Sequence, residues 1–253
     1  MYIEWASLST EAGDRRSLDG YHLPMATIDQ ILVGSVESFG PGDRMSAIRK
    51  KPVSGRVAIG RLGIEGDHHG DTIHHGGVEA AVHHYSFDNY ALWRGELPDH
   101  AGHFSAPGFF GENLSSIGLD ETNVCIGDIY RFGSTLLQVS QGRQPCWKLA
   151  RRSTIPDFAL KVQATGRTGW FYRVVEPGSA EGGDDFWLVE RPRPEWTLIR
   201  VLRIMYVNPL DSNELEGMAS LPELSPSWRR LAQTRLDSGT VEGWTSRVTL
   251  PTS

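Results

Sequence analysis

The sequence predicts a mainly β fold with peripheral helices, followed by a small helical module at the C-terminal end. Short β-type runs recur from residue 31 onward, and glycines separate them. Only occasional stretches between these runs have helical spacing, which favours a β-barrel or a β-sandwich over a fold of alternating strands and helices. The pattern changes after residue 197, where short helical segments follow one another.

The first part of the chain is divided into apolar runs by glycine-rich turns. Gly133 and Ser134 separate two such runs, and a two-residue linker that includes glycine suits the tight turn between antiparallel strands. We therefore expect a β-hairpin there. The runs lie at 31–37, 57–59, 123–133 and 135–140.

Two helices are expected among the strands. In EAAVHHYSFDNYALWRGELP, residues 79–98, apolar residues recur three or four positions apart in places, and Pro98 ends the pattern. A second helical stretch begins near Pro156 and carries Phe158 and Val162.

Three short helices are expected after RPRPEW. Asp211 and Ser225 are suitable N-caps, Pro226 suits a first helical position, and Gly239 suits a helix end. We divide the chain accordingly into an N-terminal extension (1–30), a β domain (31–197) and a C-terminal three-helix module (198–253).

Composition narrows the class of protein. The chain has 253 residues and a net charge of −6, which argues against a nucleic-acid polymer or an anionic membrane surface as a partner. No apolar stretch reaches the roughly 18 residues of a membrane span, and the N-terminus does not resemble a signal peptide. Two cysteines are too few for a disulfide framework or an iron–sulfur cluster. We expect a cytoplasmic protein.

Histidines are concentrated in one segment. Six of the nine lie in GDHHGDTIHHGGVEAAVHH. Neutral imidazoles bind zinc or iron well, but the segment has no H-E-x-x-H or C-x-x-C spacing. The alternative is that some of these histidines donate hydrogen bonds to an anionic ligand, with Gly76 and Gly77 letting it approach the backbone. The six are His68, His69, His74, His75, His83 and His84.

The segment SQGRQPCWKL places Cys146 between Arg143 and Lys148. Pro145 cannot donate to a sheet, so the chain leaves its strand here, and in an extended segment Cys146 and Lys148 would project to the same side. Nearby cations favour the thiolate, which acts as a nucleophile or as a ligand for a soft metal. A buried thiol that only fills space is the alternative, and we accept that role for Cys125.

Several segments together resemble the MOSC domain, in particular its YiiM-like branch. The resemblance extends from about residue 31 to near the C-terminus, and includes the three-helix tail. Any one motif is weak, but the series is specific. The matching segments are SAIRKKPVSGRVAIGRLGIEGD, HHGG, AVHHYSFDNY, GFFGENLSSIGL, NVCIGDIYRFGSTLLQVSQGRQPCWKL and TGRTGWFYRVVEPG.

This resemblance implies a MOSC-type β-barrel that binds a molybdenum cofactor (molybdopterin). In the family, the cysteine of the Q-x-R-x-P-C-x-K segment is the proposed thiolate ligand to molybdenum, and here it is Cys146. The proton donor would be Lys148 or a histidine, for which we name His84. The further residues expected to bind the cofactor are Lys50, His75, Gly76, Gly77, His83, Asn113 and Arg143.

The resemblance also implies an activity: reduction of N-hydroxylated compounds such as 6-hydroxylaminopurine, with two electrons and two protons consumed and water released. Electrons would come from a separate reductase, for which we expect a flavoprotein, and the family suggests a homodimer. The alternatives are a cofactor carrier or sulfur-handling protein without turnover, and a zinc hydrolase that uses the histidine cluster. One departure from the family is Val78-Glu79-Ala80, where Pro-Asp and a basic residue are common.

Overall fold

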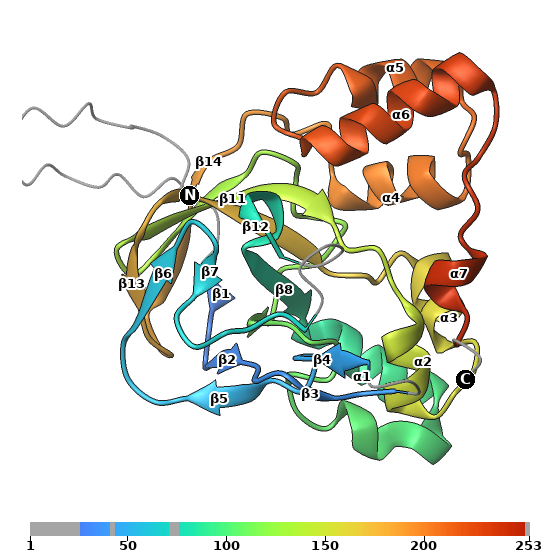
Figure 1. Ribbon diagram of the computed structural model, residues 1–253. Helices are drawn as coiled ribbons and strands as arrows, with labels where there is room; N and C mark the ends of the chain where they lie inside the picture. The colour runs from blue at the N-terminus through green and yellow to red at the C-terminus, as the bar shows by residue number, and fades with distance from the viewer. Residues whose placement is uncertain (1–25, 41–43, 71–75, 251–253) are drawn as a thin grey trace, which may run out of the picture.

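The computed structural model describes residues 26–40, 44–70 and 76–250. Its main sheet has seven strands in the order β1-β14-β10-β11-β12-β8-β9, and it curls into a nearly closed barrel (Figure 1). Neighbouring strands are antiparallel, except that β8 and β9 are parallel. The strands are β1 (Ala26–Thr27), β8 (Val82–Ser86), β9 (Leu114–Ser116), β10 (Ile129–Phe132), β11 (Thr135–Gly142), β12 (Trp170–Glu176) and β14 (Asp185–Glu190).

Within the main sheet, the predicted hairpin is confirmed, because β10 and β11 pair across Gly133 and Ser134, and Gly133 has a φ of 54°. The pairing of β11 with β12 shifts register twice, which bends the strands and helps to curl the sheet. The smaller sheets are β13 (Gly178–Ala180) with β6 (Val57–Gly60) and β7 (Gly63–Ile64), β2 (Ile31–Val33) with β5 (Lys51–Val53), and β3 (Glu37–Ser38) with β4 (Met45–Ser46).

The helix expected over residues 79–98 is only partly present. Its first half is the short helix η1 (Val78–Ala80) followed by strand β8, and the α-helix α1 covers Phe87–Glu96. All five residues of β8 are buried, and the strand pairs with β12 and β9. A short apolar run is compatible with the spacing of a helix and with that of a strand. Here the pairing with distant strands stabilises the strand. The helix near Pro156 is confirmed as α3 (Phe158–Thr165), which follows α2 (Trp147–Ser153).

The three predicted C-terminal helices are also present. Asp211 accepts a hydrogen bond from Glu214 N and Ser225 accepts one from Trp228 N, as expected of N-caps, and Gly239 ends the last of the three in a left-handed conformation. A fourth short helix follows. The helices are α4 (Leu198–Tyr206), α5 (Ser212–Ala219), α6 (Pro226–Ser238) and α7 (Thr245–Val248).

One hydrophobic core runs through the barrel and the C-terminal helices. Val139 and Tyr172 of the barrel belong to the same buried cluster as Leu202 of α4 and Trp228 of α6. The helices α4 to α6 gather on one side of the barrel and α1 to α3 on another (Figure 1). The three-part division of the chain stays a prediction. The end of the predicted N-terminal extension takes part in the main sheet, because β1 lies before residue 30 and pairs with β14.

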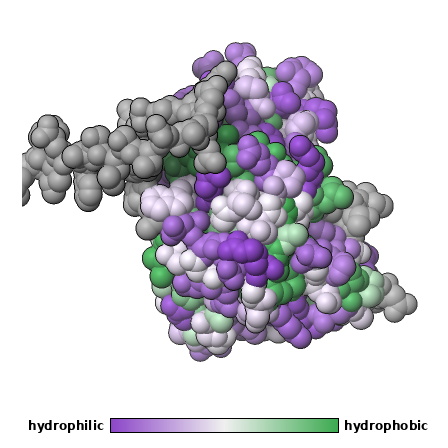
Figure 2. Space-filling model, turned by 90° about the vertical axis from the view of Figure 1, so that its left-hand side faces the viewer, coloured by the Kyte–Doolittle hydropathy of each residue, from purple (hydrophilic) through white to green (hydrophobic). Residues whose placement is uncertain are grey.

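A second, aromatic core lies under α1, α3 and η2 (Pro98–Phe104). Its centre is Phe110, which stacks on Tyr85 with 3.7 Å between ring centroids. Away from these cores, hydrophilic and hydrophobic side chains are interspersed on the face shown in Figure 2. Within the described part of the chain, no helix has the length and apolar character needed to cross a bilayer.

Candidate functional site

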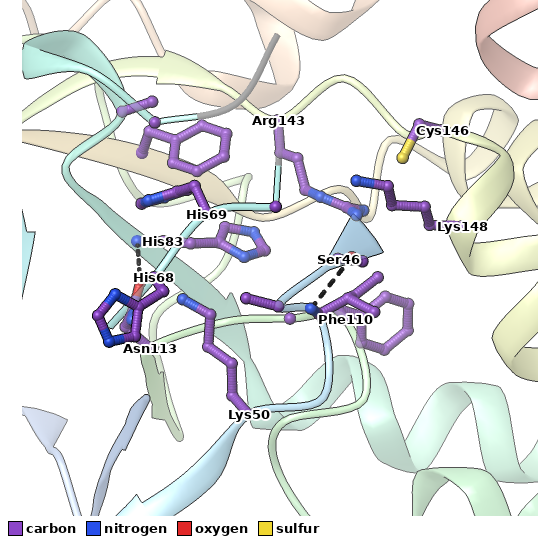
Figure 3. A pocket seen from close by; sticks show the side chains of 17 residues that line it. Ser46, Lys50, His68, His69, His83, Phe110, Asn113, Arg143, Cys146 and Lys148 are labelled. Carbon is purple, nitrogen blue, oxygen red and sulfur yellow. Dashed lines mark hydrogen bonds between the residues drawn. The ribbon is translucent and has the colours of Figure 1, made fainter. Parts of the chain in front are cut away.

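The candidate site is a pocket where one end of β8 meets the segment 46–50 and the start of α2. Figure 3 shows Arg143, Lys148 and Cys146 toward one side of it, and Lys50, His68 and Asn113 toward the other. These residues come from distant parts of the sequence, so only the fold brings them together. The side chains that carry its chemistry are three cations (Lys50, Arg143, Lys148), three imidazoles (His68, His69, His83) and the Cys146 thiol.

Cys146 occupies the N-cap position of α2 and is 9% exposed. The backbone is extended at Cys146, but α2 begins at the next residue, so Lys148 lies in the first turn of a helix and not in an extended segment. Both side chains nevertheless line the pocket. The loop before them is fixed at two points: Arg143 N donates to Gly169 O at 2.9 Å, and the Arg247 guanidinium donates to Pro145 O.

Lys50 is held in place by a buried network. Its Nζ lies 2.6 Å from Asp67 Oδ2, and the exposed fractions of the two side chains are 7% and 1%. Asp67 also accepts from Gly34 N through Oδ1 at 2.8 Å and from Asn113 Nδ2 through Oδ2 at 2.8 Å. The network therefore joins three segments of the pocket wall.

Asn113 lines the pocket, but its polar atoms are used within the protein. Its Oδ1 accepts from His83 N, and its Nδ2 donates to Leu32 O and to Asp67 Oδ2. These contacts indicate that Asn113 positions β8 and Lys50 rather than offering free donors to a ligand.

The cations of the pocket are poorly solvated. Burial lowers the pKa of the Lys50 ammonium, although Asp67 opposes the effect, and burial also lowers the pKa of the Arg143 guanidinium. Arg143 Nη1 is buried and makes no hydrogen bond to any described residue. An anionic ligand would supply the missing hydrogen bond and replace the lost hydration.

His83 faces the pocket and is neutral near pH 7. Burial, followed by the charge of Arg143, holds the pKa of its imidazole well below the usual value. The ring packs on Phe171 at 4.9 Å, and its Nε2 is buried without a hydrogen-bond partner among the described residues. The neutral ring can donate or accept one hydrogen bond there, depending on the tautomer.

His84 is not part of this pocket, which corrects the expectation that it acts as a proton donor. Adjacent residues of a strand point to opposite faces, so His84 lies on the other side of β8 from His83. It is fully buried against Trp170, and both ring nitrogens are bonded, Nδ1 to Tyr172 Oη at 3.0 Å and Nε2 to Ser116 Oγ at 2.9 Å. His84 is a residue of the barrel core.

The burial of His84 predicts a loss of stability in acid. Burial lowers the pKa of its imidazole to about 3, so the unfolded chain binds the proton near pH 6.5 while the folded protein does not. The free energy of unfolding should therefore decrease as the pH falls from about 6.5 toward 3, by about 2 kcal/mol at pH 5. Urea unfolding at pH 7.5 and 5.0 measures this, and His84→Gln should lose that part of the pH dependence. An equal pH dependence in both proteins would contradict the assignment.

The other predicted site residues are distributed as follows. Gly76 lines the pocket with a φ of 82°, whereas Gly77 does not line it. His74 and His75 lie outside the described residues. His68 and His69, two of the six clustered histidines, line the pocket. Asp67 was not predicted for the site, because Gly66-Asp67 reads in the sequence as a turn.

The described residues fit a zinc site and a molybdenum cofactor to different degrees. Within the described residues, no group of three or more His, Cys, Asp or Glu side chains is arranged to hold a metal ion, which gives the zinc alternative no support there. The pocket does fit an anionic cofactor with a soft metal: it offers one thiol, three cations and two buried nitrogens, on Arg143 and His83, that lack partners among the described residues.

Comparison with known proteins agrees with this architecture. Residues 71–187 match the MOSC domain, and residues 196–239 match the YiiM-like, 3-alpha helix domain. The chain is 38% identical to protein YiiM of Escherichia coli over 218 residues, covering 86% of this chain and 96% of YiiM. The crystal structure of that YiiM superposes with a TM-score of 0.77 at 34% identity, covering 90% and 100% of the two chains. A protein of Gibberella moniliformis named "Reductase" is 38% identical over 198 residues, which cover 78% of this chain and 35% of that protein.

Proposed function

The chain belongs to the MOSC family, in its YiiM-like branch, and from this membership we propose that it is a molybdenum-cofactor-dependent reductase. Its substrates would be N-hydroxylated compounds, such as N-hydroxylated purine bases, from which it removes the nitrogen-bound oxygen. The observation that carries the proposal is the pocket itself, where the Cys146 thiol lies among three cations.

In this proposal the side chains that line the pocket bind the cofactor and exclude water from it. Cys146 Sγ would bind molybdenum, and a bound molybdenum cofactor supplies two-electron oxygen-transfer chemistry. Arg143 would bind the anionic groups of the cofactor through Nη1, which has no hydrogen-bond partner among the described residues. Lys50, fixed by Asp67, would bind them as well. Phe110, supported by the aromatic core, and Phe171 would exclude water from the reacting group.

Two groups could hold the protons that the reaction consumes. Lys148 lines the pocket and its ammonium carries protons at Nζ, so it stays a candidate donor. His83 takes the place of His84 as the candidate imidazole, since of these two neighbours it is His83 that lines the pocket. Because the His83 ring is neutral, its part would be to orient a ligand or relay a proton rather than to supply a stored one.

Electrons would come from a separate reductase partner, for which a flavoprotein is our proposal. The Gibberella relative named "Reductase" is much longer than this chain, which spans only 35% of it. A homodimer stays part of the proposal on family grounds, and a cytoplasmic location stays part of it on the grounds of composition.

The proposal is tested with protein made in a host that synthesises the molybdenum cofactor. We expect molybdenum bound in about equimolar amount and reduction of 6-hydroxylaminopurine when a chemical electron donor is supplied. Elemental analysis and product chromatography measure the two separately. Full molybdenum loading without turnover would instead favour a cofactor carrier, and stoichiometric zinc without molybdenum would overturn the proposal.

A further inference from the structure

A second pocket lies beside the first, on the far side of a shared wall. Neighbouring residues of the same segments face the two pockets: Ile48 and Phe110 line the first, whereas Arg49 and Phe109 line the second. Its volume is about 630 Å³, which falls within the roughly 300–1,000 Å³ typical of small-molecule sites. We call it the arginine pocket.

The arginine pocket is cationic in an acidic protein. The chain has 31 acidic and 25 basic residues, yet none of the described residues that line this pocket is acidic. Three guanidiniums line it, those of Arg49, Arg151 and Arg152. Among the described residues, Arg49 forms an ion pair with Glu37, whose carboxylate lies 3.1 Å away at an exposed position.

Aromatic rings hold these guanidiniums in position. Arg49 and Arg151 both lie over the Phe39 ring, at 5.2 and 5.9 Å from its centroid. Arg152 lies over the Phe109 ring at 5.2 Å, and its Nη1 donates to Ile48 O and Gly108 O. Stacking on rings and bonding to carbonyls leave the outer edges of guanidiniums available for an anion.

We propose that the arginine pocket binds a phosphate-bearing ligand, such as a nucleoside monophosphate, at a site separate from the Cys146 pocket. Three guanidiniums match the charge of roughly −1.5 to −2 on a phosphate monoester, and each can bond phosphate oxygens through two N–H groups. The pocket volume of about 630 Å³ leaves room for a planar ring beside the phosphate. This proposal does not depend on the activity proposed for the first pocket.

The test is calorimetric titration of the purified full-length chain with adenosine 5′-monophosphate, inorganic phosphate and adenosine. We expect saturable binding of the monophosphate and none of adenosine. The variant Arg49→Gln/Arg151→Gln should weaken that binding at least about tenfold, since it removes two charge-assisted contacts. Both side chains lie at the surface of the pocket, so the fold should survive.

A matched control is Arg203→Gln/Arg230→Gln, which makes the same charge change at exposed positions of α4 and α6. It should bind the monophosphate like the unmodified protein, and so should Lys148→Gln, which alters the first pocket. Tighter binding of the monophosphate than of inorganic phosphate would identify a nucleotide-like ligand, and equal binding would identify phosphate alone. Equal affinity in both double variants, or no binding of any phosphate compound, would overturn the proposal.

Discussion

Replacing Asp67 by alanine should destabilise the protein by about 3–5 kcal/mol, because the change leaves the Lys50 ammonium buried without its counter-charge. The same change removes an acceptor from Gly34 N and one from Asn113 Nδ2. Donors left unpaired in a buried site lose hydration without compensation. Urea unfolding near pH 7 measures the difference in the free energy of unfolding.

The control for this prediction is an ion pair of the same kind at the surface. Glu37 and Arg49 lie 3.1 Å apart with side chains 43% and 56% exposed, so Glu37→Ala should cost less than about 1 kcal/mol. A double variant, Lys50→Met/Asp67→Leu, should recover much of the lost stability because it removes both charges together. If Asp67→Ala cost no more than Glu37→Ala, the buried network would not be what fixes Lys50.

The fold could be predicted where its signals are local. The turn at Gly133 and the caps at Asp211 and Ser225 act within a few residues, and all three positions behave as the sequence indicates. Strand β8 could not be predicted in this way, because its pairing partners β12 and β9 lie far along the chain. The spacing of its apolar residues is compatible with a helix and with a strand, and only the pairing within the sheet distinguishes these two structures.

Strand β8 also separates the histidine pair. Because neighbours in a strand face opposite sides, His83 faces the pocket and His84 lies in the barrel core, which the family resemblance by itself could not distinguish. Asp67 was missed for a related reason. Its partners Lys50 and Asn113 are 17 and 46 residues away, so the dipeptide Gly66-Asp67 by itself indicates no more than a turn.

Replacing Cys146 by serine should reduce the proposed reductase activity by at least about 100-fold, because altering even the residues that orient a metal ligand commonly costs 10–100-fold. Serine is nearly the same size and the site is a helix N-cap, so the fold should be retained. The two measurements are the rate of 6-hydroxylaminopurine reduction and the molybdenum content of the purified variant. Loss of activity with unchanged folding would assign Cys146 to the chemistry.

The matched control is Cys125→Ser, since Cys125 is the other cysteine of the chain and does not line the pocket. Burial raises the pKa of its thiol to about 11, so little thiolate forms near neutral pH, and its Sγ donates to Pro194 O. Cys125→Ser should keep the activity. Cofactor-free protein treated with iodoacetamide should be alkylated at Cys146 and spared at Cys125, as read by peptide mass spectrometry. Full activity of Cys146→Ser would remove the thiolate from the proposed site, and the three cations would then have to bind the cofactor without it.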